Sequence, residues 1–141
     1  MADKSKLIEG LKDDLANELG AVMLYLYQTS IAAGFDGEEL RELLRPEVAG
    51  ELAHATFLAD KIAALGGDPT TRPKEYRTPT DVKGMLELDL KLEQQAVETY
   101  KKRAQQAEEY GDLGLKVKIE EIIAEETGHV EQIERILRGW K

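Results

Sequence analysis

Two short stretches, Glu51-Leu52-Ala53-His54 and Glu126-Thr127-Gly128-His129, decide how this sequence folds. They contain the only two histidines of the chain, and each histidine follows a glutamate by three residues. Positions three apart on a helix are neighbours on one face, so each pair can direct a carboxylate and an imidazole at the same point. Such a pair from each of two helices, joined by one glutamate from each of two others, forms a di-metal site inside a four-helix bundle.

The rest of the chain repeats the same arrangement. Glu18 lies 33 residues before Glu51, and Glu93 lies 33 residues before Glu126. An offset of 75 residues also superimposes apolar residues of the two halves, for example Leu11 on Leu86, Leu44 on Ile119 and Leu58 on Ile133. The sequence therefore describes one helical hairpin written twice. Each copy carries three candidate ligands, which are Glu18, Glu51 and His54 in the first and Glu93, Glu126 and His129 in the second.

Apolar residues spaced three and four apart predict four helices. The predicted ranges are 4–33, 37–65, 81–109 and 112–138. The connections are short except for residues 66–80, where three of the four prolines predict an extended crossover. Short, long and short connections are typical of an all-α four-helix bundle with one crossover, the ferritin-like topology. We therefore predict a single domain of residues 1–141 with this fold.

Glycine and proline refine these boundaries. Gly34 and Gly37 predict the end of the first helix, and Asp36 predicts the N-cap of the second. The Gly66-Gly67 pair predicts the end of the second helix. Pro46 lies inside the second range, where it predicts a kink or a split into a short lead-in and a main segment.

The six candidate ligands occupy positions that the helical pattern otherwise gives to leucine and isoleucine. A charged group that faces a core is costly unless it is paired or binds a metal. Four inward glutamates carry a charge of -4, which two neutral histidines cannot offset and two divalent cations can. A network of buried protonated carboxylates is the alternative, but no basic residue shares these helix faces at that level. The pattern therefore predicts a di-metal centre.

The composition excludes several other functions. The chain has no cysteine, which excludes disulfides, thiolate metal sites and cysteine nucleophiles. A net charge of -9 argues against nucleic-acid binding, because phosphate repels an acidic surface. No apolar run approaches the roughly 18 residues of a membrane span, and residues 1–6 lack the apolar core of a signal peptide. We therefore predict a cytoplasmic protein that binds neither nucleic acid nor a membrane.

These motifs resemble the ferritin superfamily and, within it, the bacterioferritins, over nearly the whole chain. The resemblance rests on Asn17-Glu18-Leu19 with Tyr25, Glu51-x-x-His54-Ala55, Asp89-Leu90-x-Leu92-Glu93 and Glu125-Glu126-x-Gly128-His129. It implies that Glu51 and Glu126 bridge two irons. It further implies that Glu18 and His54 complete the shell of one iron, and Glu93 and His129 that of the other. A rubrerythrin-like centre has a further glutamate where this chain has Ala96, which favours the bacterioferritin comparison.

The same resemblance implies roles and departures outside the ligands. A tyrosine at the position of Tyr25 lies beside the centre and can supply an electron. The position of the methionine haem ligand holds Leu52 here, so we predict no haem. Bacterioferritins commonly continue into a fifth helix, whereas this sequence stops at Lys141, so we expect a small oligomer, with a cage as the alternative. Asp89 and Glu125 flank the ligands and are candidates to hold the imidazoles, although Glu125 could equally face solvent.

We therefore predict an oxidoreductase that binds two iron ions per chain and oxidises Fe(II) with O₂ or H₂O₂, with manganese as a possible replacement. A subunit of an iron-storage cage and a di-metal oxygenase are the alternatives. The electron donor is not predicted. The apolar line of Gly20, Leu24, Tyr27 and Ile31 predicts a homodimer interface through the first two helices.

Overall fold

The computed structural model describes residues 3–141, so residues 1 and 2 of the predicted domain lie outside the described part. It contains four helices: α1 (Lys4–Ile31), α2 (Gly34–Ala64), α3 (Val82–Tyr110) and α4 (Leu113–Arg138). No β-strand occurs among residues 3–141. The all-α prediction with four helices and one long connection is confirmed.

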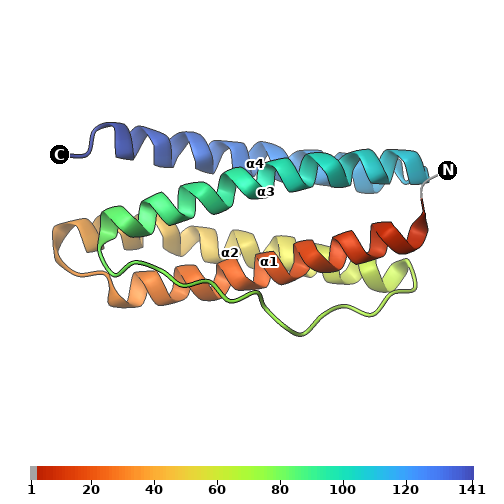
Figure 1. The fold of residues 1–141 in the computed structure, drawn as a ribbon, viewed down its shortest axis with the longest axis horizontal. Helices are drawn as coiled ribbons and strands as arrows, with labels where there is room; N and C mark the ends of the chain where they lie inside the picture. Colours follow the sequence, from red (N-terminus) through yellow and green to blue (C-terminus); the bar gives the residue numbers. More distant parts are fainter. Residues whose placement is uncertain (1–2) are drawn as a thin grey trace. The chain divides into compact units, whose positions relative to one another are not determined.

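The helices group into two compact units, each built on a hairpin. The α1–α2 unit spans Leu11–Met85, and the α3–α4 unit combines the residues up to Gly10 with Leu86–Lys141. Within each unit the two long helices lie side by side and run in opposite directions (Figure 1). Each unit therefore corresponds to one copy of the repeated hairpin in the sequence.

Aspartates define where three of the helices begin. The Asp3 carboxylate accepts from the Ser5 N–H at 2.9 Å. The Asp81 carboxylate accepts from the Gly84 N–H at 3.0 Å, and the Asp112 carboxylate accepts from the Leu115 N–H at 3.0 Å. These bonds satisfy N–H groups that have no partner inside the first helical turn. Each helix consequently starts one residue after its aspartate.

The join between α1 and α2 differs from the prediction. α2 begins at Gly34 with Ala33 as its N-cap, and the predicted N-cap Asp36 lies inside the first turn. Gly37 was predicted as a stop signal, but it is buried in α2, where an added Cβ would lie 2.6 Å from the Ala32 carbonyl carbon. The connection is thus shorter than predicted, because Gly37 lets the first turn of α2 pack directly against Ala32, just after the end of α1.

Pro46 does not split α2, which is continuous from Gly34 to Ala64. Proline removes one helical hydrogen bond, but the packing of the same face compensates for that loss. Leu40 and Leu44 before the proline and Glu51 after it are all buried on that face. The predicted split is therefore wrong, and the helix that carries the candidate ligands Glu51 and His54 is one continuous element of 31 residues.

The C-terminus of α2 is closed by two glycines. Gly66 adopts a φ of 91°, which is a left-handed conformation that glycine adopts without a steric penalty. Its N–H donates to the Ala63 carbonyl at 3.0 Å, and the Gly67 N–H donates to the Ile62 carbonyl at 2.9 Å. This pair of bonds is a Schellman motif, and it directs the chain away from the helix into the crossover.

Two apolar pairs that the repeat superimposes are fully buried in both units. Leu44 and its counterpart Ile119 are both 0% exposed, and so are Leu58 and its counterpart Ile133. Each such side chain stabilises its unit by roughly 1.5–3 kcal/mol through burial. The apolar residues above and below the ligand positions therefore fix the helix faces on which those ligands lie.

The crossover, residues 65–81, is bound along α1. The Lys74 N–H donates to the Ala16 carbonyl at 2.9 Å, and Gln28 Nε2 donates to Thr78 Oγ1 at 2.9 Å. The segment leaves a pocket of about 600 Å³ against α1. Leu24 is only 4% exposed, so its place in the predicted apolar surface line is wrong, and the reason is that it lies in the part of α1 that the crossover covers.

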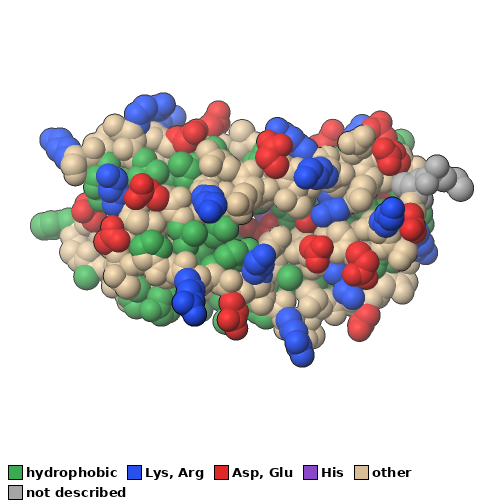
Figure 2. All heavy atoms as spheres, viewed as in Figure 1, with side chains coloured by type: hydrophobic (Ala, Val, Ile, Leu, Met, Phe, Trp, Pro, Cys, Tyr) green, Lys and Arg blue, Asp and Glu red, His purple; other side chains and the backbone are tan. Residues whose placement is uncertain are grey.

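The face of the molecule drawn in Figure 2 carries both charges and exposed apolar side chains. Figure 2 shows lysine, arginine, aspartate and glutamate side chains interspersed, with hydrophobic side chains over the C-terminal half of α1 and the crossover. The exposed apolar side chains there include Met23, Leu26 and Tyr27, each more than half exposed. In the described part of the chain, no helix has both the length and the apolar character needed to cross a bilayer.

Candidate metal centre

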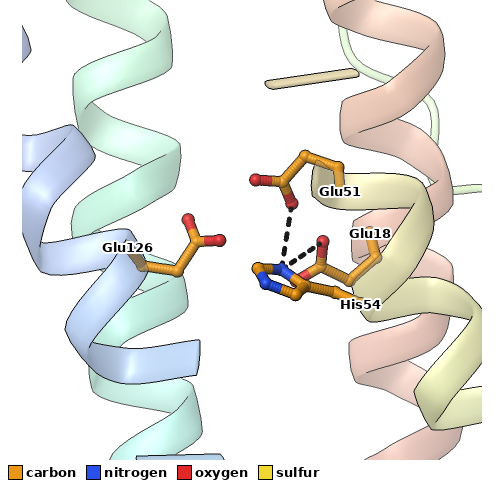
Figure 3. A group of neighbouring side chains, drawn as sticks. All are labelled: Glu18, Glu51, His54 and Glu126. Atoms are coloured by element: carbon orange, nitrogen blue, oxygen red, sulfur yellow. Dashed lines mark ion pairs between the residues drawn. The ribbon is translucent and has the colours of Figure 1, made fainter. Parts of the chain in front are cut away.

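Three of the predicted ligands meet inside the α1–α2 unit. His54 Nδ1 lies 3.7 Å from Glu18 Oε2 and 3.9 Å from Glu51 Oε2. In Figure 3, Glu18 from α1 and Glu51 from α2 both point toward the imidazole of His54. All three side chains are buried. We call this set the first cluster; Glu126, also drawn in Figure 3, belongs to the second.

The second cluster has the same construction in the α3–α4 unit. His129 Nδ1 lies 3.7 Å from Glu93 Oε1 and 3.7 Å from Glu126 Oε2. Glu93 comes from α3, and the other two residues come from α4. Both glutamates are buried, whereas 23% of the His129 side chain is exposed, against 7% for His54. The repeat in the sequence has therefore produced two matched Glu–Glu–His clusters, the second more open at its histidine.

The ligands are held by the same helix faces that build the core. On α4, Glu126 follows the buried Ile122 by one turn and precedes the buried Ile133 by two. On α2, Glu51 and His54 lie between the buried Leu44 and Leu58. Apolar neighbours on both sides restrict the rotation of each helix, and they keep bulk water away from the carboxylates. Glu51, His54 and Glu126 are therefore buried at core positions, as the helical pattern predicted.

Each cluster fits a divalent cation. Its three ligand atoms lie within 4.8 Å of one another. Two donors that are each about 2.1 Å from a shared ion lie about 3.0–4.2 Å apart, depending on the angle at the ion. The nitrogen-to-oxygen distances of 3.7 and 3.9 Å fall in that range and are too long for hydrogen bonds. Two carboxylates and a neutral imidazole also give a charge of -2, which one divalent ion neutralises.

The remaining sequence predictions have distinct outcomes. Tyr25 is 2% exposed on α1, and its counterpart Tyr100 is 3% exposed on α3. Asp89 is fully buried one turn before Glu93. Glu125 is exposed, so of its two predicted placements the solvent-facing one is correct. Glu47, for which no placement was predicted above, is also buried, one turn before Glu51 on α2.

Two polar residues near the first cluster were not predicted from the sequence. The Tyr76 hydroxyl, in the crossover, donates to Asn17 Oδ1 at 3.0 Å, next to Glu18 in the chain. Burial raises the pKa of Tyr76 above its ordinary value, and the negative charge of Glu18 raises it further. Asp14, one turn before Glu18, is 2% exposed and lies 75 residues before Asp89. The repeat offset could have identified Asp14, whereas a tyrosine in a non-periodic linker gave no signal.

Comparison with known proteins agrees with this geometry. Residues 8–141 match the family model of the ferritin-like domain. The bacterioferritin of Brucella melitensis is 33% identical over 135 residues, which cover 95% of this chain and 84% of the relative. The similarity therefore extends through both clusters and does not arise from a single motif.

Two solved structures share the arrangement of the whole chain. A ferritin-like, diiron-carboxylate protein from Bacillus anthracis superimposes with a TM-score of 0.93 at 38% identity, covering 97% of this chain and 99% of that one. The bacterioferritin of Desulfovibrio desulfuricans, described with a diiron site in different catalytic states, superimposes with a TM-score of 0.88 at 32% identity. That match covers 96% of this chain and 80% of the other. The predicted ferritin-like four-helix fold is confirmed.

Proposed function

Because this chain belongs to the ferritin-like family, we propose that its two Glu–Glu–His clusters together form one di-iron centre that oxidises Fe(II). The observation that carries the proposal is the pair of matched, buried clusters, each with ligand atoms within 4.8 Å of one another. In this proposal Glu51 and Glu126 are shared between the two metal positions. Glu18 with His54 completes one position, and Glu93 with His129 completes the other.

The chemistry of the ligands supports iron oxidation. Four carboxylates and two imidazoles are hard donors that bind iron in either oxidation state and also accept manganese. The negative charge of the carboxylates favours Fe(III) over Fe(II), so bound Fe(II) becomes a better reductant. The buried apolar side chains beside each cluster exclude water and strengthen this electrostatic preference.

Electron counting favours peroxide as the oxidant. Two Fe(II) ions give up two electrons, which is the number that reduces H₂O₂ to water. O₂ needs four electrons for full reduction, so it requires a further donor, a second centre or release of peroxide. Tyr25 is a buried phenol two helical turns from Glu18. We propose that it supplies the third of the four electrons when O₂ is reduced to water, and that a reductant from outside the centre supplies the fourth.

The stoichiometry of metal uptake tests the centre. Apo-protein titrated anaerobically with Fe(II) should bind two ions per chain. Glu126→Ala should abolish the uptake of the pair, because it removes a ligand shared by both positions, whereas Glu125→Ala at the exposed neighbouring position should bind like the wild type. Binding of no iron, or of one ion, by the wild-type chain would refute the di-iron proposal.

Stopped-flow oxidation of the Fe(II)-loaded protein tests the oxidant and the role of Tyr25. Peroxide should oxidise the iron faster than O₂ does. Tyr25→Phe should slow a phase of the O₂ reaction, and the matched control Tyr100→Phe should leave every phase unchanged. Equal rates with both oxidants would refute the preference for peroxide, and unchanged kinetics in Tyr25→Phe would make Tyr25 a packing residue only.

Several further properties of the protein are also proposals. Leu52 has no donor atom for a haem iron, so we propose a chain without haem, which a visible absorption spectrum of purified protein checks. Iron replacement by manganese and a cytoplasmic location also stay predictions, and a di-metal oxygenase stays an alternative. Measurements of molar mass and of iron content per particle distinguish iron storage from Fe(II) oxidation alone. A storage cage would be large and would hold hundreds of irons per particle.

For the assembly we propose a two-fold homodimer through α1 and α2. The exposed apolar side chains that support it are Met23, Leu26, Tyr27 and Ile31 of α1 and Leu52 of α2. Exposed apolar side chains that lie together on one surface commonly mark a site of association. This set replaces the predicted line, because Leu24 is buried and only Tyr27 and Ile31 of the original four are exposed large side chains.

A further inference from the structure

The crossover is hydrogen-bonded to α1 at the two residues just before the proposed ligand Glu18. Its Lys74 N–H binds the Ala16 carbonyl, and its Tyr76 hydroxyl binds the Asn17 side chain at 3.0 Å. Both acceptors lie within two residues of Glu18 along the chain. The contact at Asn17 joins residues 59 apart in sequence, so it ties the non-helical segment to the helix turn that carries the ligand.

Gly20 makes this close approach possible. A Cβ at Gly20 would lie 2.8 Å from Cε2 of the Tyr76 ring, and it would collide with the Lys74 carbonyl. The tyrosine ring therefore occupies the space that any other residue at this position would fill.

The second cluster lacks the residues that this fastening requires. The repeat offset that pairs Glu18 with Glu93 pairs Asn17 with Leu92, which cannot accept a hydrogen bond through its side chain. It also pairs Gly20 with Gln95, whose side chain would block a close backbone approach. The candidate ligands are thus duplicated. The residues that allow the crossover to bind next to Glu18 have no counterpart in sequence next to Glu93.

We propose that Tyr76 is a positioning residue that fixes Glu18 through Asn17 and the α1 backbone, so that the metal position of Glu18 and His54 binds more tightly than that of Glu93 and His129. This inference rests on the proposed di-metal centre. A ligand whose helix turn is already held in place loses less freedom when it binds a metal. Outer partners of this kind typically change metal affinity by about 10–100-fold when they are removed.

Co(II) binding in two single-position backgrounds tests the proposal. His129→Ala disables the second position and His54→Ala disables the first, and anaerobic titration followed by the Co(II) absorption bands then reports on one position at a time. Tyr76→Phe should weaken Co(II) binding by about ten-fold in the His129→Ala background, at the lower end of the range for outer partners. In the His54→Ala background it should leave the affinity unchanged.

Two further variants distinguish positioning from a general effect on stability. Tyr27→Phe removes a hydroxyl from another tyrosine of the same pocket, 53% exposed, and should bind Co(II) like its parent in both backgrounds. Asn17→Leu copies the second half of the chain and should weaken the first position as Tyr76→Phe does, with no additional loss in the double variant.

The outcomes separate the two proposals. Equal weakening of both positions by Tyr76→Phe, or no weakening of either, would overturn the positioning role while leaving the centre in place. Additive losses in the double variant would also overturn it, because Tyr76 would then not act through Asn17. A wild-type chain that binds no Co(II) at all would overturn the proposed centre itself, and the positioning role with it.

Discussion

Replacing Glu126 by leucine should make the metal-free protein more stable and weaken its response to metal. Glu126 is 1% exposed and lies on the same face of α4 as the buried Ile122 and Ile133. Leucine has nearly the volume of glutamate, so the substitution leaves the packing intact and removes a carboxylate from an apolar position. Replacement of a buried ion pair by apolar residues of similar size is neutral or stabilises a protein by about 1–4 kcal/mol, and removal of one carboxylate from a cluster with a net negative charge should act in the same direction.

That range converts into a measurable shift of the melting temperature. For a chain of this length, 1 kcal/mol corresponds to roughly 4 °C, so apo Glu126→Leu should melt roughly 4–16 °C above the apo wild type. Added metal should stabilise the wild type more than Glu126→Leu. A single site at a free metal concentration of 100 times its Kd adds about 2.7 kcal/mol to the wild type, and Glu126→Leu should gain less, because both proposed metal positions lose a shared ligand.

Thermal unfolding followed by circular dichroism, in chelator and in excess Co(II), measures both effects. Glu125→Leu is the matched control, because it makes the same substitution at the exposed neighbouring position. Its stability should stay within about 0.5 kcal/mol of the wild type, and its metal response should be intact. The reasoning fails if apo Glu126→Leu melts below the apo wild type, since the buried carboxylate would then be stabilised by its protein surroundings without metal.

Three further substitutions test separate parts of the structure. Gly20→Ala should destabilise the fold by about 1–3 kcal/mol in urea unfolding, because its Cβ would crowd Tyr76 and Lys74. The control Gly128→Ala, whose Cβ would have nothing within 4 Å, should be neutral or stabilising. Equal effects of the two substitutions on the free energy of unfolding would refute the crowding at Gly20. Tyr76 has a pKa above its unfolded value, so its contribution to apo stability is present below about pH 10 and is lost as the pH rises through the folded pKa. Tyr76→Phe should therefore show a weaker alkaline loss in pH-dependent unfolding, and an unchanged profile would exclude Tyr76 as its source. Leu52→Asp should lower the molar mass in light scattering, whereas Leu113→Asp, at another exposed position, should not, and an unchanged mass in Leu52→Asp would refute the proposed interface.

The helical pattern predicted the ligand-bearing core because core and ligands obey the same periodicity. Glu126 could be placed from the isoleucines around it, and Glu51 from Leu44 and Leu58, without knowledge of any contact. Burial of those neighbours determines which way each helix faces, and a ligand in register with them must face the same way. The two Glu–Glu–His clusters are therefore encoded locally, one in each hairpin.

The errors occurred where contacts between distant segments decide the structure. Gly37 was predicted to end a helix, but glycine also occurs inside helices where the backbone packs closely. Here the close contact with Ala32 determines its role. Leu24 was placed on the surface because it lies on an apolar line of α1 beside the stripe that faces the core. The crossover that covers this part of α1 has no periodicity, so the sequence gives no indication of where it lies. For the same reason Tyr76 could not be linked to Glu18 before the structure was known.

The duplication of the hairpin and the single crossover have different consequences for the site. Duplication supplies equal ligand sets, and alone it would produce two equivalent metal positions. The crossover occurs once and is bound at Ala16 and Asn17, so it can support only the ligand on α1. A symmetric ligand set with an asymmetric support allows one metal position to stay filled while the other exchanges. If Tyr76 acts as proposed, sequential filling of the two positions follows from the topology of the chain, without any difference in the ligands themselves.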